Sequence, residues 1–243
     1  MNSAQSIAPR AGASPLRAFC LGGVMLAALA APVRADTTVV NEGGVTVDVG
    51  LTAAAGLFHV GNANLGAGVV NPDGSVDRDR NWAEGFIAPH AAATLTTDSA
   101  GVFYGGVRVV AAGTAGDGDA GGSVQGDEGR FDLDHLFAGW RSGTLFPALG
   151  EDAVDVSVGR QPFNIGDGFL LNDGNADGPR DGAYWLAPRT GWGPSSVVAR
   201  VNVAPFHLDL FRLTSDSDSF SDLIYGANVE WHSAPEGGTV VGV

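Results

Sequence analysis

Residues 173–178 match the opening of a calcium-binding loop. They read Asp-Gly-Asn-Ala-Asp-Gly, and in such loops hard oxygen ligands surround a tight glycine turn. The glutamate that normally closes the loop would fall at position 184, which is Tyr184. Two interpretations remain open: a structural calcium site, and a solvated acidic loop with no cofactor. The calcium ligands would be Asp173, Asn175, Asp177 and Asp181.

The sequence lacks the motifs of common enzyme classes. Residues 116–121 fit the spacing GxGxxG, but no helix pattern follows, and Asp117 and Asp119 would repel a pyrophosphate. The five histidines are scattered without the spacing of a zinc hydrolase. Nothing identifies a catalytic dyad, so we do not expect an enzyme.

A further group of polar side chains alternates with apolar residues along extended segments. Arg108 and Arg200 each lie on the polar face of a segment whose other face is apolar. If such segments were the strands of a membrane barrel, an arginine on the lipid-facing side would cost about 2–4 kcal/mol at the bilayer midplane. On the other side, a water-filled lumen would solvate it. Opposed arginine and carboxylate groups would screen solutes by charge. The predicted pore-lining residues are Asp48, Arg108, Asp155, Arg200, Asn202, Asn228 and Glu230.

The segments that carry these residues have a period of two, which indicates β-strands. In residues 45–57 the odd positions are apolar and the even positions are mostly polar or glycine, and residues 225–232 repeat the pattern. We expect bulges or register shifts where the alternation is less clean, at 84–96, 131–141 and 207–213. The remaining predicted strands are 102–112, 154–159, 196–203 and a last one at 239–243.

The connections between these segments alternate in length, which is typical of outer-membrane β-barrels with short turns at one end and long loops at the other. Such strands must close into a ring, because lipid cannot satisfy an open sheet edge. We therefore predict an all-β fold, an antiparallel transmembrane β-barrel or a partial barrel of 9–10 strands; the alternative is a secreted soluble β-protein with a calcium-stabilised loop. The long connections are 59–83, 113–131 and 160–195, and the short ones are 97–101, 204–206 and 233–238; 142–153 and 214–224 are of medium length, so the alternation holds for most but not all connections.

Composition and charge narrow the function classes. The net charge is −14 and every basic residue is arginine, so the chain repels phosphate and nucleic acid is not an expected partner. No apolar run reaches the roughly 20 residues of a membrane-spanning helix. Residues 1–35 have arginines, a 14-residue uncharged stretch and small residues before Asp36, the three parts of a secretory signal peptide. The mature domain, residues 36–243, would carry 10 arginines against 27 acids and no cysteine.

The most specific motif lies in residues 154–183. A strand ends in Gly159-Arg160-Gln161, and Gly166-Asp167-Gly168 and then Asp181-Gly182 follow. This arrangement resembles outer-membrane porins of the alginate-export type and their substrate-specific porin relatives. The acidic stretch 172–178 departs from what a polyanion exporter would carry, which weakens the alginate assignment but not the porin one.

The resemblance implies a β-barrel in the outer membrane of a Gram-negative bacterium, through which small or saccharide-like solutes pass passively. Its implied partners are membrane lipid, lipopolysaccharide and the barrel assembly machinery. A wide channel of 16–18 strands would need about twice this length, so we expect residues 36–243 to be the N-terminal part of a longer barrel. The alternative is a complete, non-conducting barrel of 8–10 strands that acts as an adhesin or structural element.

Aromatic residues support two further expectations. Phe58, Trp140, Phe206 and Trp231 fall near predicted strand ends, where such rings favour the membrane interface. The longest connection, 160–195, is the expected functional loop. Its aromatic residues either line the solute path or pack against the barrel wall; they are Tyr184, Trp185 and Trp192, among Arg180 and Arg189.

Overall fold

The computed structural model describes residues 28–29, 33–71, 73–124, 126–174, 180–217, 222–233 and 240–242. It consists of one large antiparallel sheet of 11 strands and a two-stranded sheet of β4 (Val69–Val70) and β5 (Val76–Asp77). The described residues include one short 3-10 helix, η1 (Asn64–Gly66), and no helix with the length and hydropathy to cross a membrane. The all-β, antiparallel prediction is therefore confirmed.

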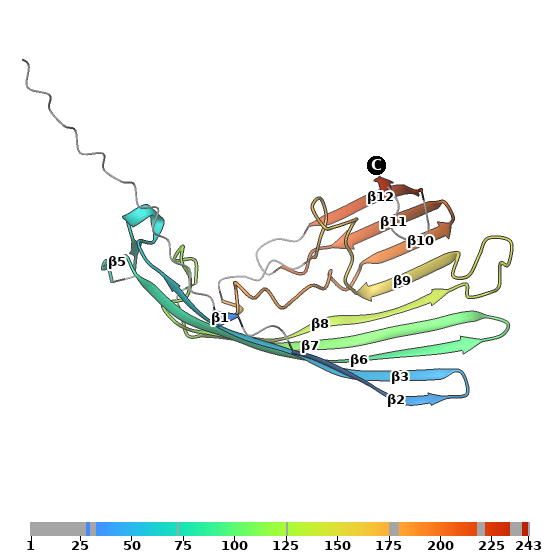
Figure 1. The fold of residues 1–243 in the computed structure, drawn as a ribbon, viewed down its shortest axis with the longest axis horizontal. Coiled ribbons are helices and arrows are strands. Elements are labelled where there is room, and N and C mark those ends of the chain that lie inside the picture. Colours follow the sequence, from blue (N-terminus) through green and yellow to red (C-terminus); the bar gives the residue numbers. More distant parts are fainter. Residues whose placement is uncertain are drawn as a thin grey trace, which may run out of the picture.

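The strands of the large sheet follow the predicted segments, extended at several ends. They are β1 (Ala28–Leu29), β2 (Val33–Glu42), β3 (Val45–Val60), β6 (Arg80–Thr97), β7 (Gly101–Gly116), β8 (Glu128–Arg141), β9 (Val154–Arg160), β10 (Val197–Val203), β11 (Phe206–Thr214), β12 (Leu223–His232) and β13 (Val240–Gly242). Each strand from β3 onward pairs with the next one in the sheet order, and β1 and β2 both pair with β3. The sheet curves into a trough whose edges, β2 and β13, are not paired with each other (Figure 1).

The first edge of the sheet was not predicted as a strand. β1 continues the line of β2 along β3, because Ala28 pairs with Leu57 and Val33 pairs with Ala53. β2 therefore begins before the predicted signal cleavage at Asp36, and its residues from Asp36 onward also pair with β3. A tight turn joins β2 to β3, in which Gly43 and Gly44 both have positive φ, a conformation that favours glycine in hairpins.

Only one of the three expected irregularities is present. The register between β7 and β8 shifts between Arg108 and Val109, opposite residues 133–135, as expected for 131–141. The predictions for 84–96 and 207–213 are wrong, because these segments keep a constant register with both neighbours. The shift turns both Asp134 and His135 toward residues of the connection between β9 and β10.

Because antiparallel strands reverse at every connection, successive connections lie at opposite ends of the sheet (Figure 1). The two longest, 61–79 and 161–196, lie at one end; the connections of two or three residues lie at the other, together with the longer 142–153. We call these the loop end and the turn end. The connections at the turn end are 43–44, 98–100, 142–153, 204–205 and 233–239, and those at the loop end are 61–79, 117–127, 161–196 and 215–222.

The two faces of the sheet differ in their side chains. We call the face that contacts residues 161–196 the inner face and the opposite one the outer face. Large apolar side chains on the outer face are exposed from β3 to β12. They are Val49, Leu51, Leu57, Ile87, Leu95, Phe103, Val107, Phe131, Leu133, Leu136, Val156, Val158, Val197, Val201, Phe206, Leu210, Tyr225, Val229 and Trp231.

Candidate functional site

The connection 161–196, which we call the inner loop, lies across the inner face of the sheet (Figure 1). Both of its ends are anchored by an apolar cluster against β10 and β11. Phe163 and Trp192 of the loop pack there with Val198, Phe211 and Leu213 of the sheet. The Trp192 indole Nε1 donates to the Phe163 carbonyl oxygen at 2.9 Å, so the loop buries the polar atom of this side chain as well.

Farther along, the inner loop reaches β6 and binds the buried Glu84. One carboxylate oxygen of Glu84 accepts hydrogen bonds from the backbone amides of Trp185 and Leu186, at 2.9 and 3.0 Å. The Trp185 ring meets the rings of Trp82 and Phe58, with centroid separations of 5.2 and 5.8 Å. Trp185 and Trp192 therefore pack against the wall, and Phe58 is a buried inner-face residue instead of an interface aromatic.

An ionic network ties the same loop to β8. The Asp181 carboxylate lies between Arg130 and Arg189, at 2.8 and 2.6 Å, and both arginines also contact Asp132 at 2.7 Å. The Ala183 amide donates to the Thr114 hydroxyl of β7 at 2.8 Å. Because most of these groups are shielded from water, loss of one partner would leave a costly unpaired charge.

Asp134, which is 1 % exposed, makes the tightest connection between loop and sheet. One of its carboxylate oxygens accepts from the backbone amides of Thr190 and Gly191, both at 2.9 Å, and the other accepts from Arg108. Arg108 also donates to the Pro188 carbonyl oxygen at 2.8 Å. Glycine is required at position 191, because a Cβ atom there would lie 2.1 Å from the Asp134 carbonyl oxygen.

The seven predicted pore-lining residues all lie on the inner face, but in separate surroundings. Arg108 is held beneath the inner loop. Asp48 lies near the β2 edge, where the Thr38 hydroxyl donates to it at 2.6 Å. The other five form one band across the short strands, which we call the polar band; they are Asp155, Arg200, Asn202, Asn228 and Glu230, on β9, β10 and β12.

Residues that were not predicted join the members of the polar band. Asp209 of β11 lies 3.5 Å from Arg200 Nε and accepts from the Asn228 amide at 3.1 Å. The Tyr104 hydroxyl of β7 donates to Asp155, and Arg200 lies 3.6 Å from Asp155. Asp209 alternates with Leu208 and Leu210, so the pattern that predicted the other members also predicts its face.

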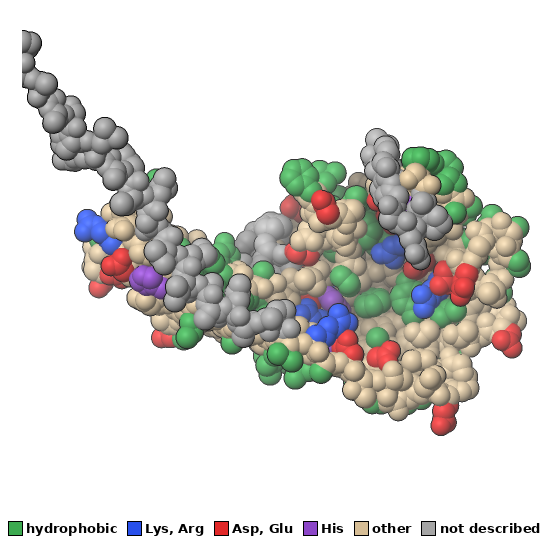
Figure 2. Space-filling view, viewed as in Figure 1, with side chains coloured by type: hydrophobic (Ala, Val, Ile, Leu, Met, Phe, Trp, Pro, Cys, Tyr) green, Lys and Arg blue, Asp and Glu red, His purple; other side chains and the backbone are tan. Residues whose placement is uncertain are grey.

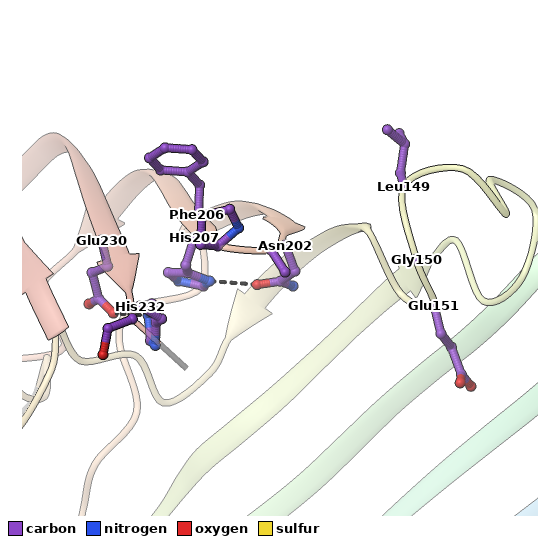
Figure 3. A pocket seen from close by; sticks show the side chains of 11 residues that line it. Leu149, Gly150, Glu151, Asn202, Phe206, His207, Glu230 and His232 are labelled. Atoms are coloured by element: carbon purple, nitrogen blue, oxygen red, sulfur yellow. Dashed lines mark hydrogen bonds and ion pairs between the residues drawn. The ribbon is translucent and has the colours of Figure 1, made fainter. Parts of the chain in front are cut away.

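At the turn end the polar band opens into a hollow of about 580 Å³, shown in Figure 3. His207 lies between the Asn202 amide oxygen, at 2.5 Å, and the Asp209 carboxylate, at 2.9 Å. His232 lies 3.0 Å from one carboxylate oxygen of Glu230, and the other oxygen accepts from the Asn228 amide. The hollow is therefore lined by polar groups that already bind one another.

The structure offers no support for a calcium ion at Asp181. Both of its oxygens face guanidinium groups, which would repel a cation. Asn175 and Asp177 lie outside the described residues, and Asp173 accepts from the neighbouring Asn172 amide. Within the described part of the chain, no three histidine, cysteine or acidic residues are grouped so that they could hold a metal. The calcium site stays a prediction.

The motif residues mainly shape the backbone. Gly159 has φ +118°, and a Cβ atom there would lie 2.3 Å from the Leu136 carbonyl oxygen; a Cβ atom at Gly182 would lie 2.7 Å from the Gly113 Cα atom. Arg160 is paired with Asp216 at the loop end. Four more motif residues lie at the start of the inner loop. Gln161 is buried, Gly166 and Gly168 have positive φ, and the Asp167 carboxylate accepts a hydrogen bond from the Phe169 amide.

Comparison with known proteins does not add to this description. No family model matches the sequence, and no curated protein and no solved structure is significantly similar to it.

Proposed function

We propose that this protein is an outer-membrane channel through which small or saccharide-like solutes pass passively. The observation that carries the proposal is the division of the sheet into an apolar outer face and a charged inner face. A soluble protein seldom leaves so many contiguous large apolar side chains uncovered. An outward apolar surface and a polar interior are the pattern of transmembrane barrels.

The outer face supports contact with lipid. Its exposed apolar residues extend without interruption from β3 to β12. Phe206 and Trp231, which are register partners, lie on this face at the turn end, and Tyr225 lies toward the loop end. Aromatic rings at both borders of an apolar belt match the two interfaces of a membrane.

The inner face supports a water-filled path. Its arginines and carboxylates gather in the hollow of the trough (Figure 2), where water can solvate those that are not covered. The inner loop crosses this face from β10 to β6, so it would narrow the path beside it. A narrowed, charged path would select solutes by size and charge.

The proposal includes closure of the sheet. The backbone groups along the outer edges of β2 and β13 have no partner among the described strands, and each such group would cost several kcal/mol inside lipid. Closure would come either from further strands or from a second copy of the chain. Light scattering of the detergent-solubilised protein distinguishes these, because only the second requires a dimer.

The decisive test compares two neighbours on β10. Val201 lies on the outer face and Asn202 on the inner face, and both are exposed. In lipid vesicles we expect Val201→Arg to lower the free energy of unfolding by about 2–4 kcal/mol, because it places a charge against hydrocarbon. Asn202→Arg should fold normally and shift ion selectivity toward anions in planar-bilayer recordings. Equal stability of the two variants, or a wild-type protein that is monomeric without detergent and does not conduct, would refute the proposal.

A further inference from the structure

A second hollow, of about 370 Å³, lies on the inner face where the inner loop leaves β9. Tyr104 and Phe137 supply aromatic walls, and Arg141, Asp155, Gln161 and Arg200 supply polar ones. The hollow is thus lined by residues of five neighbouring strands, β6 to β10, and by the first two residues of the loop. Its volume falls in the range of pockets that enclose small molecules.

Two hydrogen-bond donors at this hollow lack an acceptor. Gln161 is 3 % exposed; its amide oxygen accepts from the Ser157 hydroxyl, which fixes the side chain, while its Nε2 has no acceptor among the described residues. Arg141 Nε is also buried and has none there. Buried donors without acceptors are costly, so an oxygen atom that came within reach of either group would be bound favourably.

The two aromatic walls stand edge to face, so each ring presents a flat surface in its own direction. The Tyr104 ring lies over Gly139, where an added Cβ atom would stand 2.3 Å from its Cζ. The edge of one ring faces the other, with 6.2 Å between the Tyr104 and Phe137 centroids, and the Arg141 guanidinium stands 5.5 Å from the Tyr104 centroid. Flat apolar faces beside directed donors suit a ring that has both C–H faces and oxygen substituents.

The charges around the hollow disfavour an anion. Arg141 is paired with Asp152 at 3.4 Å. Arg200 lies between Asp155 and Asp209, at 3.6 and 3.5 Å. Two guanidinium groups therefore face three carboxylates, and a bound carboxylate would be repelled by Asp155.

We propose that this hollow binds an uncharged, hydroxyl-bearing ring of monosaccharide size. Oxygens of the solute accept from Gln161 Nε2 and Arg141 Nε, and its C–H groups contact Tyr104 and Phe137. This site would specify the class of solute that passes through the proposed channel. The inference rests on the channel proposal only for the route by which the solute reaches the hollow. Binding itself is measured without conductance.

The test uses the full chain in detergent, with D-glucose as the uncharged probe and D-glucuronate as its carboxylate counterpart. Ligand-observed NMR titrations give the dissociation constants. Gln161→Met removes the donors with little change in length, and Arg141→Lys keeps the charge but removes the Nε donor. Asn164→Met, at an exposed position of the same loop, is the matched control.

We expect the wild type and Asn164→Met to bind glucose equally and to bind glucuronate more weakly. Gln161→Met and Arg141→Lys should each weaken glucose binding about 5–10-fold, the equivalent of one lost hydrogen bond. Unchanged binding in both variants, tighter binding of glucuronate, or no binding of glucose to the wild type would overturn the inference. In the last case conductance of the reconstituted protein would still decide the channel proposal separately.

Discussion

The sheet has two halves with different strand lengths. The long-strand half consists of β3, β6, β7 and β8, with 16, 18, 16 and 14 residues. The short-strand half consists of β9, β10, β11 and β12, with 7, 7, 9 and 10 residues. In the proposed channel about 9–11 residues of each tilted strand would lie in the bilayer, so the long strands would continue past it at the loop end, where Figure 1 shows them extending beyond the others.

The two halves also hold the inner loop by different means. The long-strand half uses charged groups, mainly Glu84, Asp132 and Asp134. The short-strand half uses the apolar cluster around Leu213 and leaves most of its charges in the polar band. Charges in the first half therefore hold the loop, whereas Arg200 and Asp155 in the second half remain partly exposed on the inner face. Three comparisons test this distinction, in order of expected effect.

The largest effect should come from Asp134→Ala in the long-strand half. The substitution leaves Arg108 without its carboxylate and removes the acceptor for the Thr190 and Gly191 amides. Breaking a buried pair from one side costs about 3–5 kcal/mol. We expect this loss of unfolding free energy in urea titrations of the detergent-solubilised protein, together with faster proteolysis of the inner loop.

Asp98→Ala is the matched control, because Asp98 is exposed in the turn between β6 and β7. It should leave stability and proteolysis at their wild-type values. If Asp134→Ala behaved like this control, the buried charges would not be what holds the loop, and the distinction between the two halves would fail.

A sequence pattern can predict the strands of this protein better than its loop. Local alternation marks β3 and β12 because their odd and even positions differ in polarity over many residues. β2 was missed because the predicted signal cleavage divides it. Glu84 and Trp185 lie 101 residues apart, and no local pattern contains the information that they meet.

Leu213→Ala should have the next largest effect, in the short-strand half. Leu213 is fully buried in the apolar cluster, and such truncations cost about 2–5 kcal/mol through lost burial and the cavity that remains. The control is Leu210→Ala on the same strand, where the side chain is 50 % exposed on the outer face. Thermal unfolding should separate the two variants clearly; equal losses would show that the cluster does not anchor the loop.

The faces of the candidate site follow from sequence, but its partners do not. Alternation places Arg108 and Arg200 on the polar face, where the structure has both. It cannot reveal that a register shift beside Arg108 turns Asp134 toward the loop. Nor can it distinguish a covered arginine from an open one, because that depends on residues 188–191, which are distant in sequence.

The sharpest comparison replaces the two arginines singly by glutamine, and Arg200→Gln should have the smallest effect on stability of all the variants other than the controls. Arg108 is covered by the inner loop and bound to Asp134 and Pro188, so Arg108→Gln should mainly lower stability and loosen the loop. Arg200 faces the polar band, and its loss leaves Asp155 and Asp209 uncompensated. A unit charge at 4 Å in water contributes about 1 kcal/mol, so Arg200→Gln should shift the permeability ratio toward cations by up to about fivefold, with little loss of stability. Reversal potentials in planar bilayers measure the selectivity, and urea titrations measure the stability. The distinction between a covered and an open arginine would be contradicted if Arg108→Gln changed selectivity more than Arg200→Gln, or if Arg200→Gln were the less stable of the two.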